Sequence, residues 1–167
     1  MSNKTATFGV TIAGFGWWGQ HMARRLADHS KITVRGVTET DAAKRQEIVA
    51  AGQKAFESLD EALARTDVDA VILTTPNLLH EEQVIQCAKA GKHVFCEKPL
   101  GLTAASARRS VAACKEAGVQ LGIGHERRFE TAMLALKSAI DQHDLGIIMH
   151  AEAAFSHDKL IHVPNGD

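Results

Sequence analysis

The chain of 167 residues lacks the run of about 20 apolar residues that a membrane-spanning helix requires. Its N-terminus also lacks the apolar stretch of a signal peptide. Cysteines are few, and Cys87, Cys96 and Cys114 lie far apart without a CxxC pair. These absences predict a cytoplasmic protein with no membrane span, whose reduced thiols serve as small core residues.

The sequence has no excess of either charge, since 19 lysines and arginines stand against 20 aspartates and glutamates. We therefore expect no nucleic-acid partner and no attraction to an anionic membrane. The histidines show no spacing that is typical of a metal site, so no metal is predicted. The apolar content of 45% suffices for the core of one domain of ordinary size.

Short apolar segments alternate with segments of helical periodicity along most of the chain. This alternation predicts an α/β fold with a doubly wound parallel sheet and helices on both faces. In such sheets ligands bind beyond the carboxyl ends of the strands. The predicted strands are 7–13, 32–39, 54–56, 70–73, 93–96 and 119–123, and the predicted helices follow Gly19 and cover 41–51, 59–65, 84–88 and 103–118.

The C-terminal segment has a different pattern. Residues 129–142 have the periodicity of a helix, and residues 147–155 alternate with a period of two, which is typical of a strand with one buried face. We predict a first domain over 1–128, followed over 129–167 by a linking helix and the first strand of a second α/β domain that the chain does not complete. Alone, this tail would expose an apolar face, so we expect it to pair with another copy, to be disordered, or to belong to a longer polypeptide.

A glycine-rich turn, Gly14-Phe-Gly16-Trp-Trp-Gly19, connects the first predicted strand with the first helix. In this context a GxGxxG motif is typical of dinucleotide binding. Gly14 permits the tight turn, Gly16 leaves room for a pyrophosphate, and Gly19 lets the helix approach the sheet. Trp17 is expected to border the cofactor. The alternative is a turn whose glycines serve packing alone.

Glu39 ends the second predicted strand. A carboxylate at this place can accept hydrogen bonds from ribose hydroxyls and repels a 2′-phosphate. Lys44 and Arg45 lie nearby in the sequence. The sequence therefore favours NAD as the cofactor and leaves NADP possible.

Lys98 follows the fifth predicted strand and stands between Glu97 and Pro99. A lysine ammonium at the edge of a site can hold a substrate hydroxyl, polarise a carbonyl or relay a proton. Glu97 could orient it through a charge-assisted hydrogen bond, and the bond to Pro99 could be cis. The alternative is a surface Glu-Lys pair before a turn proline, but the position after a strand favours a catalytic role.

These motifs together resemble the family of glucose-fructose oxidoreductases, inositol dehydrogenases and MocA-type oxidoreductases. The resemblance implies a Rossmann domain that binds NAD(P), and a following α/β domain whose open sheet binds sugar- or cyclitol-like substrates. It also implies hydride transfer between nicotinamide and a hydroxyl carbon, and homo-oligomers formed through the C-terminal region. The matching segments are GFGWWG (14–19), VTETD (37–41), TTPNLLH (74–80), AGKHVFCEKPLGLT (90–103) and GIGHERRF (122–129).

The resemblance also assigns roles to single residues. Lys98 would hold the reacting oxygen beside the nicotinamide, with Glu97 next to it, and both are predicted to be catalytic. Arg128 would lie near the nicotinamide end. The full set predicted to bind the cofactor is Gly14, Gly16, Trp17, Gly19, Glu39, Thr75, Pro76, Asn77, His80, Glu97, Lys98 and Arg128.

Two departures from the family pattern stand out. Glu126 occupies a place where the family often has asparagine, and no histidine of this chain occupies the motif of the family's catalytic histidine, which belongs to the second domain. We therefore expect the chain to bind a dinucleotide and to be nearly inactive alone. The alternatives are a non-catalytic dinucleotide sensor and an enzyme whose missing sheet comes from another chain. The presence of Lys98 favours an enzyme.

Overall fold

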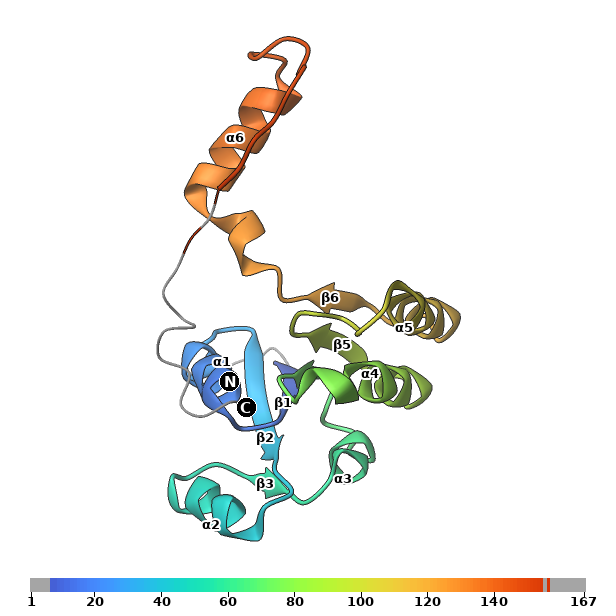
Figure 1. Ribbon diagram of the computed structural model, residues 1–167. Helices are drawn as coiled ribbons and strands as arrows, with labels where there is room; N and C mark the ends of the chain where they lie inside the picture. Colours follow the sequence, from blue (N-terminus) through green and yellow to red (C-terminus); the bar gives the residue numbers. More distant parts are fainter. Residues whose placement is uncertain (1–6, 155, 157–167) are drawn as a thin grey trace, which may run out of the picture. The chain divides into compact units, whose positions relative to one another are not determined.

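The computed structural model describes residues 7–154 and 156 (Figure 1). The chain divides into two compact units, Met1–His125 and Glu126–Asp167. The domain boundary predicted after residue 128 stays a prediction.

A parallel sheet forms the centre of the first unit. Within the described residues it has six strands in the order β3-β2-β1-β4-β5-β6. The order reverses between β1 and β4, which creates the switch point at which doubly wound sheets bind ligands. This topology confirms the predicted Rossmann-like α/β fold. The strands are β1 (Phe8–Ala13), β2 (Ile32–Thr38), β3 (Ala55–Phe56), β4 (Ala70–Leu73), β5 (His93–Cys96) and β6 (Leu121–Ile123).

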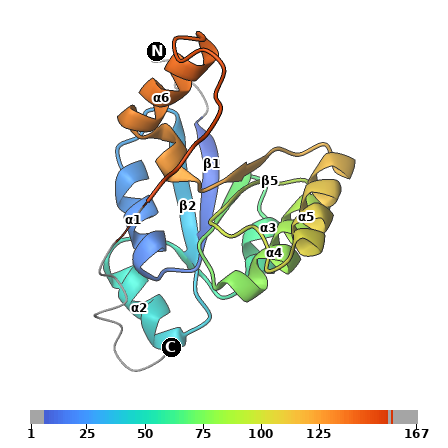
Figure 2. The ribbon, with the colours of Figure 1, turned by 45° about the horizontal axis from the view of Figure 1, so that its top comes forward.

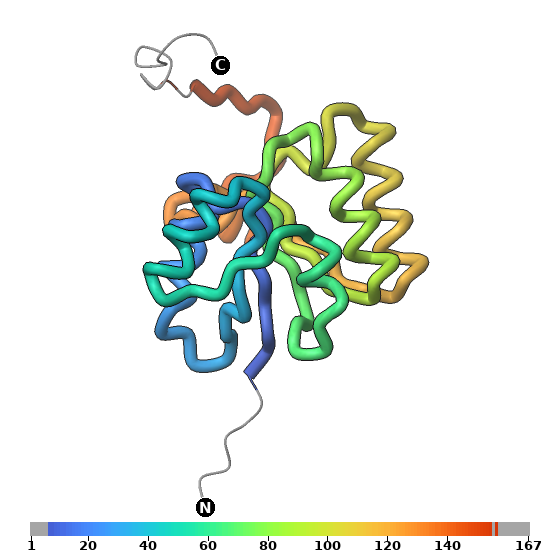
Figure 3. Tube along the Cα trace, turned by 90° about the horizontal axis from the view of Figure 1, so that it is seen from below, coloured from blue at the N-terminus to red at the C-terminus, as the bar shows by residue number. Residues whose placement is uncertain are grey.

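Helices cover both faces of this sheet. Figures 1 and 2 show α1 and α2 on one side and α3, α4 and α5 on the other. Figure 3 shows α4 and α5 running side by side. None of the described helices is long and apolar enough to cross a membrane. The helices are α1 (Trp17–Leu26), α2 (Ala42–Ala50), α3 (Leu59–Leu63), α4 (His80–Lys89) and α5 (Ala104–Glu116), with a 3-10 turn η1 (Asn77–Leu79) before α4.

Side-chain caps fix several of the helix starts. The Asp41 carboxylate accepts hydrogen bonds from the N–H groups of Ala43 and Lys44, at 2.8 and 3.1 Å, and so caps α2. Thr103 and Ser106 form a reciprocal capping box at the start of α5. These caps satisfy N–H groups that have no partner within the helix, and so stabilise the helix starts.

Two apolar cores lie on opposite faces of the sheet, because successive side chains of a strand point in opposite directions. Val71 and Leu73 of β4 belong to the core under α3, α4 and α5, whereas Ala70 and Ile72 belong to the core under α1. The predicted role of the cysteines is confirmed: Cys87, Cys96 and Cys114 are free, buried and part of the first core. Burial raises the pKa of Cys87 and of Cys96 to about 12, so both thiols stay protonated at neutral pH.

The second unit contains a short 3-10 turn, η2 (Glu126–Phe129), and helix α6 (Thr131–Asp141). The predicted helix over 129–142 is therefore confirmed, with ends shifted by one or two residues. The predicted strand over 147–155 is wrong for residues 147–154, and residue 155 lies outside the described part. A strand needs a neighbour for its backbone hydrogen bonds, and none pairs with residues 147–154 within the described chain. Ile147 and Met149 are 86% and 88% exposed, so the alternating pattern buries no face.

Candidate functional site

A pocket of about 570 Å³ lies at the carboxyl ends of β1, β2 and β4. Its walls come from the segments that follow these strands, which is the edge where parallel sheets bind ligands. Five residues predicted to bind a cofactor line it together: Gly14, Gly16, Glu39, Thr75 and Pro76. The remaining lining residues are Phe15, Thr38, Thr40, Lys44, Glu57, Ser58, Leu59, Thr74, Leu79 and Gln83.

Glycine stands at each of the three positions of the turn for a different physical reason. Gly14 has φ of +86°, in the left-handed region that side chains disfavour. A Cβ on Gly19 would lie 2.1 Å from the carbonyl oxygen of Gly14, so only glycine lets α1 approach the turn this closely. A Cβ on Gly16 would meet no atom within 4 Å. Packing within the chain therefore does not require glycine at position 16, and the open space there suits a ligand.

The N-terminus of α1 points into this turn without a side-chain cap. Its N-cap residue is Gly16, and no acidic residue stands in the first turn. The first N–H groups of a helix lack partners within the helix and carry the positive end of its dipole, so they favour an anion. The Thr74 hydroxyl fixes the turn by donating to the carbonyl oxygen of Gly14 at 2.8 Å. This arrangement fits a pyrophosphate.

Glu39 lies directly after β2 and presents a carboxylate to the pocket. Its Oε1 accepts a hydrogen bond of 3.1 Å from the N–H of Asp41. Arg45 donates to the carbonyl oxygens of Glu39 and Thr40 at 2.9 and 2.7 Å, and its guanidinium also pairs with the Glu57 carboxylate at 3.8 Å. Lys44 also lines the pocket. The loop thus offers a carboxylate to ribose hydroxyls, while the nearby arginine is engaged with the backbone.

The wall after β4 is formed by Thr75 and Pro76, and the Thr75 hydroxyl donates to Gln83 of α4. Asn77 is exposed at the start of η1 and does not line the pocket. His80 does not line it either, because its side chain is buried, with 1% exposure. The predicted contacts of Asn77 and His80 with a cofactor stay predictions.

The lysine loop follows β5, and its Lys98-Pro99 peptide bond is cis. Glu97 is buried, and its Oε2 accepts a hydrogen bond of 3.2 Å from the backbone N–H of Lys98. The same carboxylate lies against Gly124, where a Cβ would come within 2.6 Å of Oε1. Glu97 therefore holds the backbone of the loop. Lys98 is exposed, and no ion pair between the Glu97 and Lys98 side chains is present in the described part of the chain.

Several predicted residues lie outside the pocket wall. Trp17 begins α1, is 66% exposed and stacks on His21. Gly19 is buried beneath the turn. Glu97 and Lys98 do not line the pocket, and Arg128 belongs to the second unit, so the cofactor contacts of these residues stay predictions.

Sequence reasoning missed several lining residues that it could have found. Thr74 directly follows β4, and Glu57 and Ser58 follow β3, so the rule that ligands bind at the carboxyl ends of strands points to all three. Leu79 and Gln83 follow no strand directly, and no sequence signal places them in the wall.

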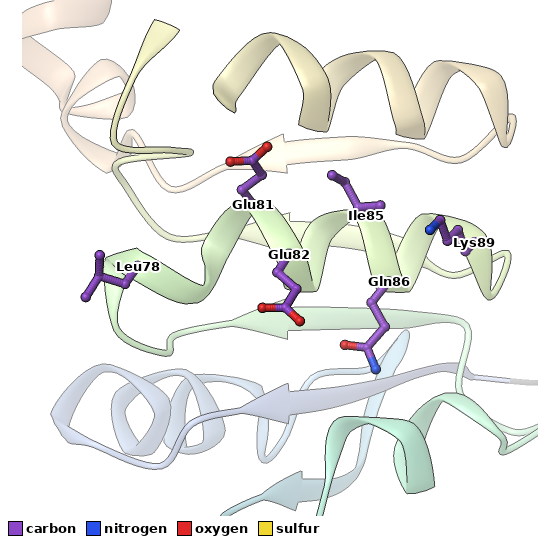
Figure 4. A pocket seen from close by; sticks show the side chains of 6 residues that line it. All are labelled: Leu78, Glu81, Glu82, Ile85, Gln86 and Lys89. Carbon is purple, nitrogen blue, oxygen red and sulfur yellow. The ribbon is translucent and has the colours of Figure 1, made fainter. Parts of the chain in front are cut away.

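A larger hollow of about 630 Å³ lies along the outward face of α4, as Figure 4 shows. Within it Glu81 is paired with Arg109 of α5, and Gln86 donates to Asp60 of α3. This hollow has no glycine turn, and Glu81 and Glu82 stand in the first turn of the helix beside it, where they disfavour an anion. We therefore place the candidate ligand site at the strand ends. Its lining residues are Leu78, Glu81, Glu82, Ile85, Gln86 and Lys89.

Residues 8–125 match the GFO/IDH/MocA family, described as an oxidoreductase family with an NAD-binding Rossmann fold. The chain belongs to this family. The resemblance deduced from the motifs is thereby confirmed, and so is the expectation of an NAD-binding Rossmann fold.

Named relatives agree with this assignment. An uncharacterized oxidoreductase of Streptococcus pneumoniae serotype 4 is 37% identical over 145 residues, which cover 86% of this chain and 39% of the relative. Inositol 2-dehydrogenase of Rhodococcus erythropolis is 36% identical, with coverages of 94% and 46%. The crystal structure of the WlbA dehydrogenase from Bordetella pertussis, in complex with NADH and UDP-GlcNAcA, is 32% identical with a TM-score of 0.79, covering 84% of this chain and 41% of that one. The chain thus spans less than half the length of each of these proteins.

Proposed function

We propose that this chain is the cofactor-binding part of an NAD(P)-dependent oxidoreductase that acts on a hydroxyl carbon of a sugar- or cyclitol-like substrate. The observation that carries the proposal is the pocket at the strand ends, with open space at Gly16, an uncapped start of α1 and the carboxylate of Glu39. The substrate class is supported by the names of two relatives, an inositol 2-dehydrogenase and a dehydrogenase crystallised with UDP-GlcNAcA.

Different residues of the first unit would bind different parts of the dinucleotide. The amides at the start of α1 would bind the pyrophosphate, and Glu39 would accept hydrogen bonds from the adenosine ribose. Thr75 and Pro76 would form the wall on the opposite side. NAD is favoured over NADP, because a 2′-phosphate would meet the Glu39 carboxylate while Arg45 is engaged with the loop backbone. When bound, the nicotinamide ring supplies the hydride acceptor or donor.

We assign to Lys98 the contact with the reacting oxygen of the substrate. Its ammonium is exposed beyond the carboxyl end of β5 and can hold or polarise a hydroxyl or carbonyl. Glu97 supports it indirectly, by accepting from the N–H of Lys98 and so fixing the loop. Trp17, Asn77 and Arg128 stay predicted neighbours of the cofactor.

The alternative function, a non-catalytic dinucleotide sensor, has no support from these relatives, because their names are those of oxidoreductases or dehydrogenases. Three further statements remain predictions of the sequence: a homo-oligomer formed through the C-terminal region, a cytoplasmic location, and the lack of a nucleic-acid partner.

Calorimetric titration of the chain with NADH and with NADPH tests the proposal. We expect binding of NADH, and weaker binding of NADPH. If neither dinucleotide bound at millimolar concentration, both the oxidoreductase and the sensor would be refuted. A panel of sugars and cyclitols with NAD tests the role of Lys98. Any turnover that the chain supports should disappear in Lys98→Ala, and turnover that persists in this variant would remove Lys98 from the reaction.

A further inference from the structure

His80 occupies an unusual place for a polar side chain. It is the first residue of α4, and its imidazole is 1% exposed. A buried polar group is costly unless it forms hydrogen bonds. Both ring nitrogens lie at hydrogen-bond distance from backbone carbonyls: Nδ1 lies 2.7 Å from the oxygen of Pro99, and Nε2 lies 2.9 Å from the oxygen of Thr75.

The two carbonyls belong to two different parts of the candidate site. Thr75 lines the dinucleotide pocket after β4. Pro99 directly follows Lys98 in the loop after β5. The His80 side chain therefore contacts both the pocket wall and the lysine loop, although it does not line the pocket itself.

The chemistry of imidazole suits such a bridge. Both partners are acceptors, so the ring must donate. A neutral imidazole donates through one nitrogen and an imidazolium through both, so the imidazolium is the form that holds both carbonyls at once. An aliphatic side chain could not replace His80 at this buried position, because the two carbonyl groups opposite it need a hydrogen-bond donor.

We propose that His80 is a positioning residue that links the Lys98 loop to the Thr75 wall of the pocket, and so holds the ammonium of Lys98 in register with the bound dinucleotide. The proposal rests on the proposed function, since it concerns the same site. It differs from the cofactor contact predicted for His80 from the sequence, because here the ring acts through two backbone carbonyls.

Three chains test this link: the parent, His80→Leu and His80→Gln. Leucine fills the buried space without a donor, whereas glutamine keeps an amide N–H. Two measurements are made on each, the NADH affinity by calorimetry and the backbone hydrogen exchange of segments 73–78 and 96–102 by mass spectrometry. We expect His80→Leu to accelerate exchange in both segments and to weaken NADH binding about tenfold, the usual scale for one buried hydrogen bond. His80→Gln should recover part of both effects.

His29→Leu is the matched control. The exposed His29 ring accepts hydrogen bonds from the N–H groups of Lys31 and Ile32 in the turn before β2, away from the pocket. This variant should leave NADH affinity and exchange in both segments unchanged.

The outcomes separate the two proposals. If the parent binds no dinucleotide, the proposed function fails, but the exchange data still test the bridge. Unchanged exchange in both segments of His80→Leu would overturn the bridge, and so would a glutamine variant that behaves like leucine in both measurements. If His80→Leu does not fold, nitrogen-15 NMR of the parent decides: two ring N–H groups of His80 protected from solvent exchange are expected, and the absence of either refutes the bridge.

Discussion

Gly16→Ala separates ligand binding from folding in the glycine turn. Gly16 has an extended backbone, with φ of −68° and ψ of −166°, and an added Cβ would meet no protein atom within 4 Å. Alanine reduces the freedom of the unfolded chain, which is worth about 0.4–1 kcal/mol, and it loses a comparable amount as a poorer N-cap. The free energy of unfolding should therefore change by less than about 1 kcal/mol.

The same methyl group occupies the space in front of the amides at the start of α1. A pyrophosphate displaced from that space would lose hydrogen bonds to charged oxygens, each worth about 1.5–3 kcal/mol. Loss of two such bonds weakens NADH binding by about a hundredfold or more. Calorimetry measures this change, and thermal unfolding in the absence of ligand measures stability.

Gly19→Ala provides the contrasting control three residues later. Its Cβ would lie 2.1 Å from the carbonyl oxygen of Gly14, so α1 must move away from the sheet. Overpacking of this kind costs about 1–3 kcal/mol, and the melting temperature should fall. The reasoning about the turn is refuted if Gly16→Ala binds NADH within threefold of the parent while its melting temperature is unchanged.

Three other predictions concern specificity, thiol chemistry and stability. Glu39→Ala should narrow the difference between NADH and NADPH affinities, because Lys44 stays in the pocket while the repelling carboxylate is removed; an unchanged ratio in calorimetry would exclude Glu39 from ribose recognition. Cys87 and Cys96 should resist a thiol reagent at pH 8 in the folded chain and react after unfolding, since burial raises the pKa of each to about 12. Labelling of the folded chain at pH 8 would contradict the burial. Because the two pKa values are raised in the folded chain, the protonated thiols contribute fully to the free energy of unfolding below the ordinary thiol pKa of 9.0, and this contribution declines as pH rises toward 12. Melting temperatures should therefore drop across that pH range. Thr103→Ala should destabilise the chain by about 1 kcal/mol in denaturant unfolding through loss of the cap of α5, and Thr103→Ser should not.

Local signals were sufficient for the first unit. The unbroken apolar run Ala70–Leu73 predicts a strand covered on both faces, and the structure places it in the middle of the sheet with a different core on each side. The glycine turn and Glu39 could be predicted as neighbours because parallel strands end at one edge, whatever the details of their packing.

Residues whose place depends on contacts distant in sequence were harder to predict. The alternation over 147–155 predicted a strand, but alternation states only which side chains share a face, and a strand also needs a partner backbone. The sequence allowed a charge-assisted bond from Glu97 to the Lys98 ammonium, whereas in the structure Glu97 accepts from the backbone N–H of Lys98 and packs on Gly124. The cofactor contact of His80 stays a prediction, and its two carbonyl partners could not be foreseen, because they come from loops that only the folded sheet brings together.

The position of the aromatic residues has a practical consequence. The chain has two tryptophans, Trp17 and Trp18, and they stand in succession at the start of α1 with ring centroids 4.7 Å apart. The indole fluorescence of this chain therefore originates beside the glycine turn. Since reduced nicotinamide absorbs where indole emits, energy transfer from these rings can report occupancy of the turn in real time without an added label.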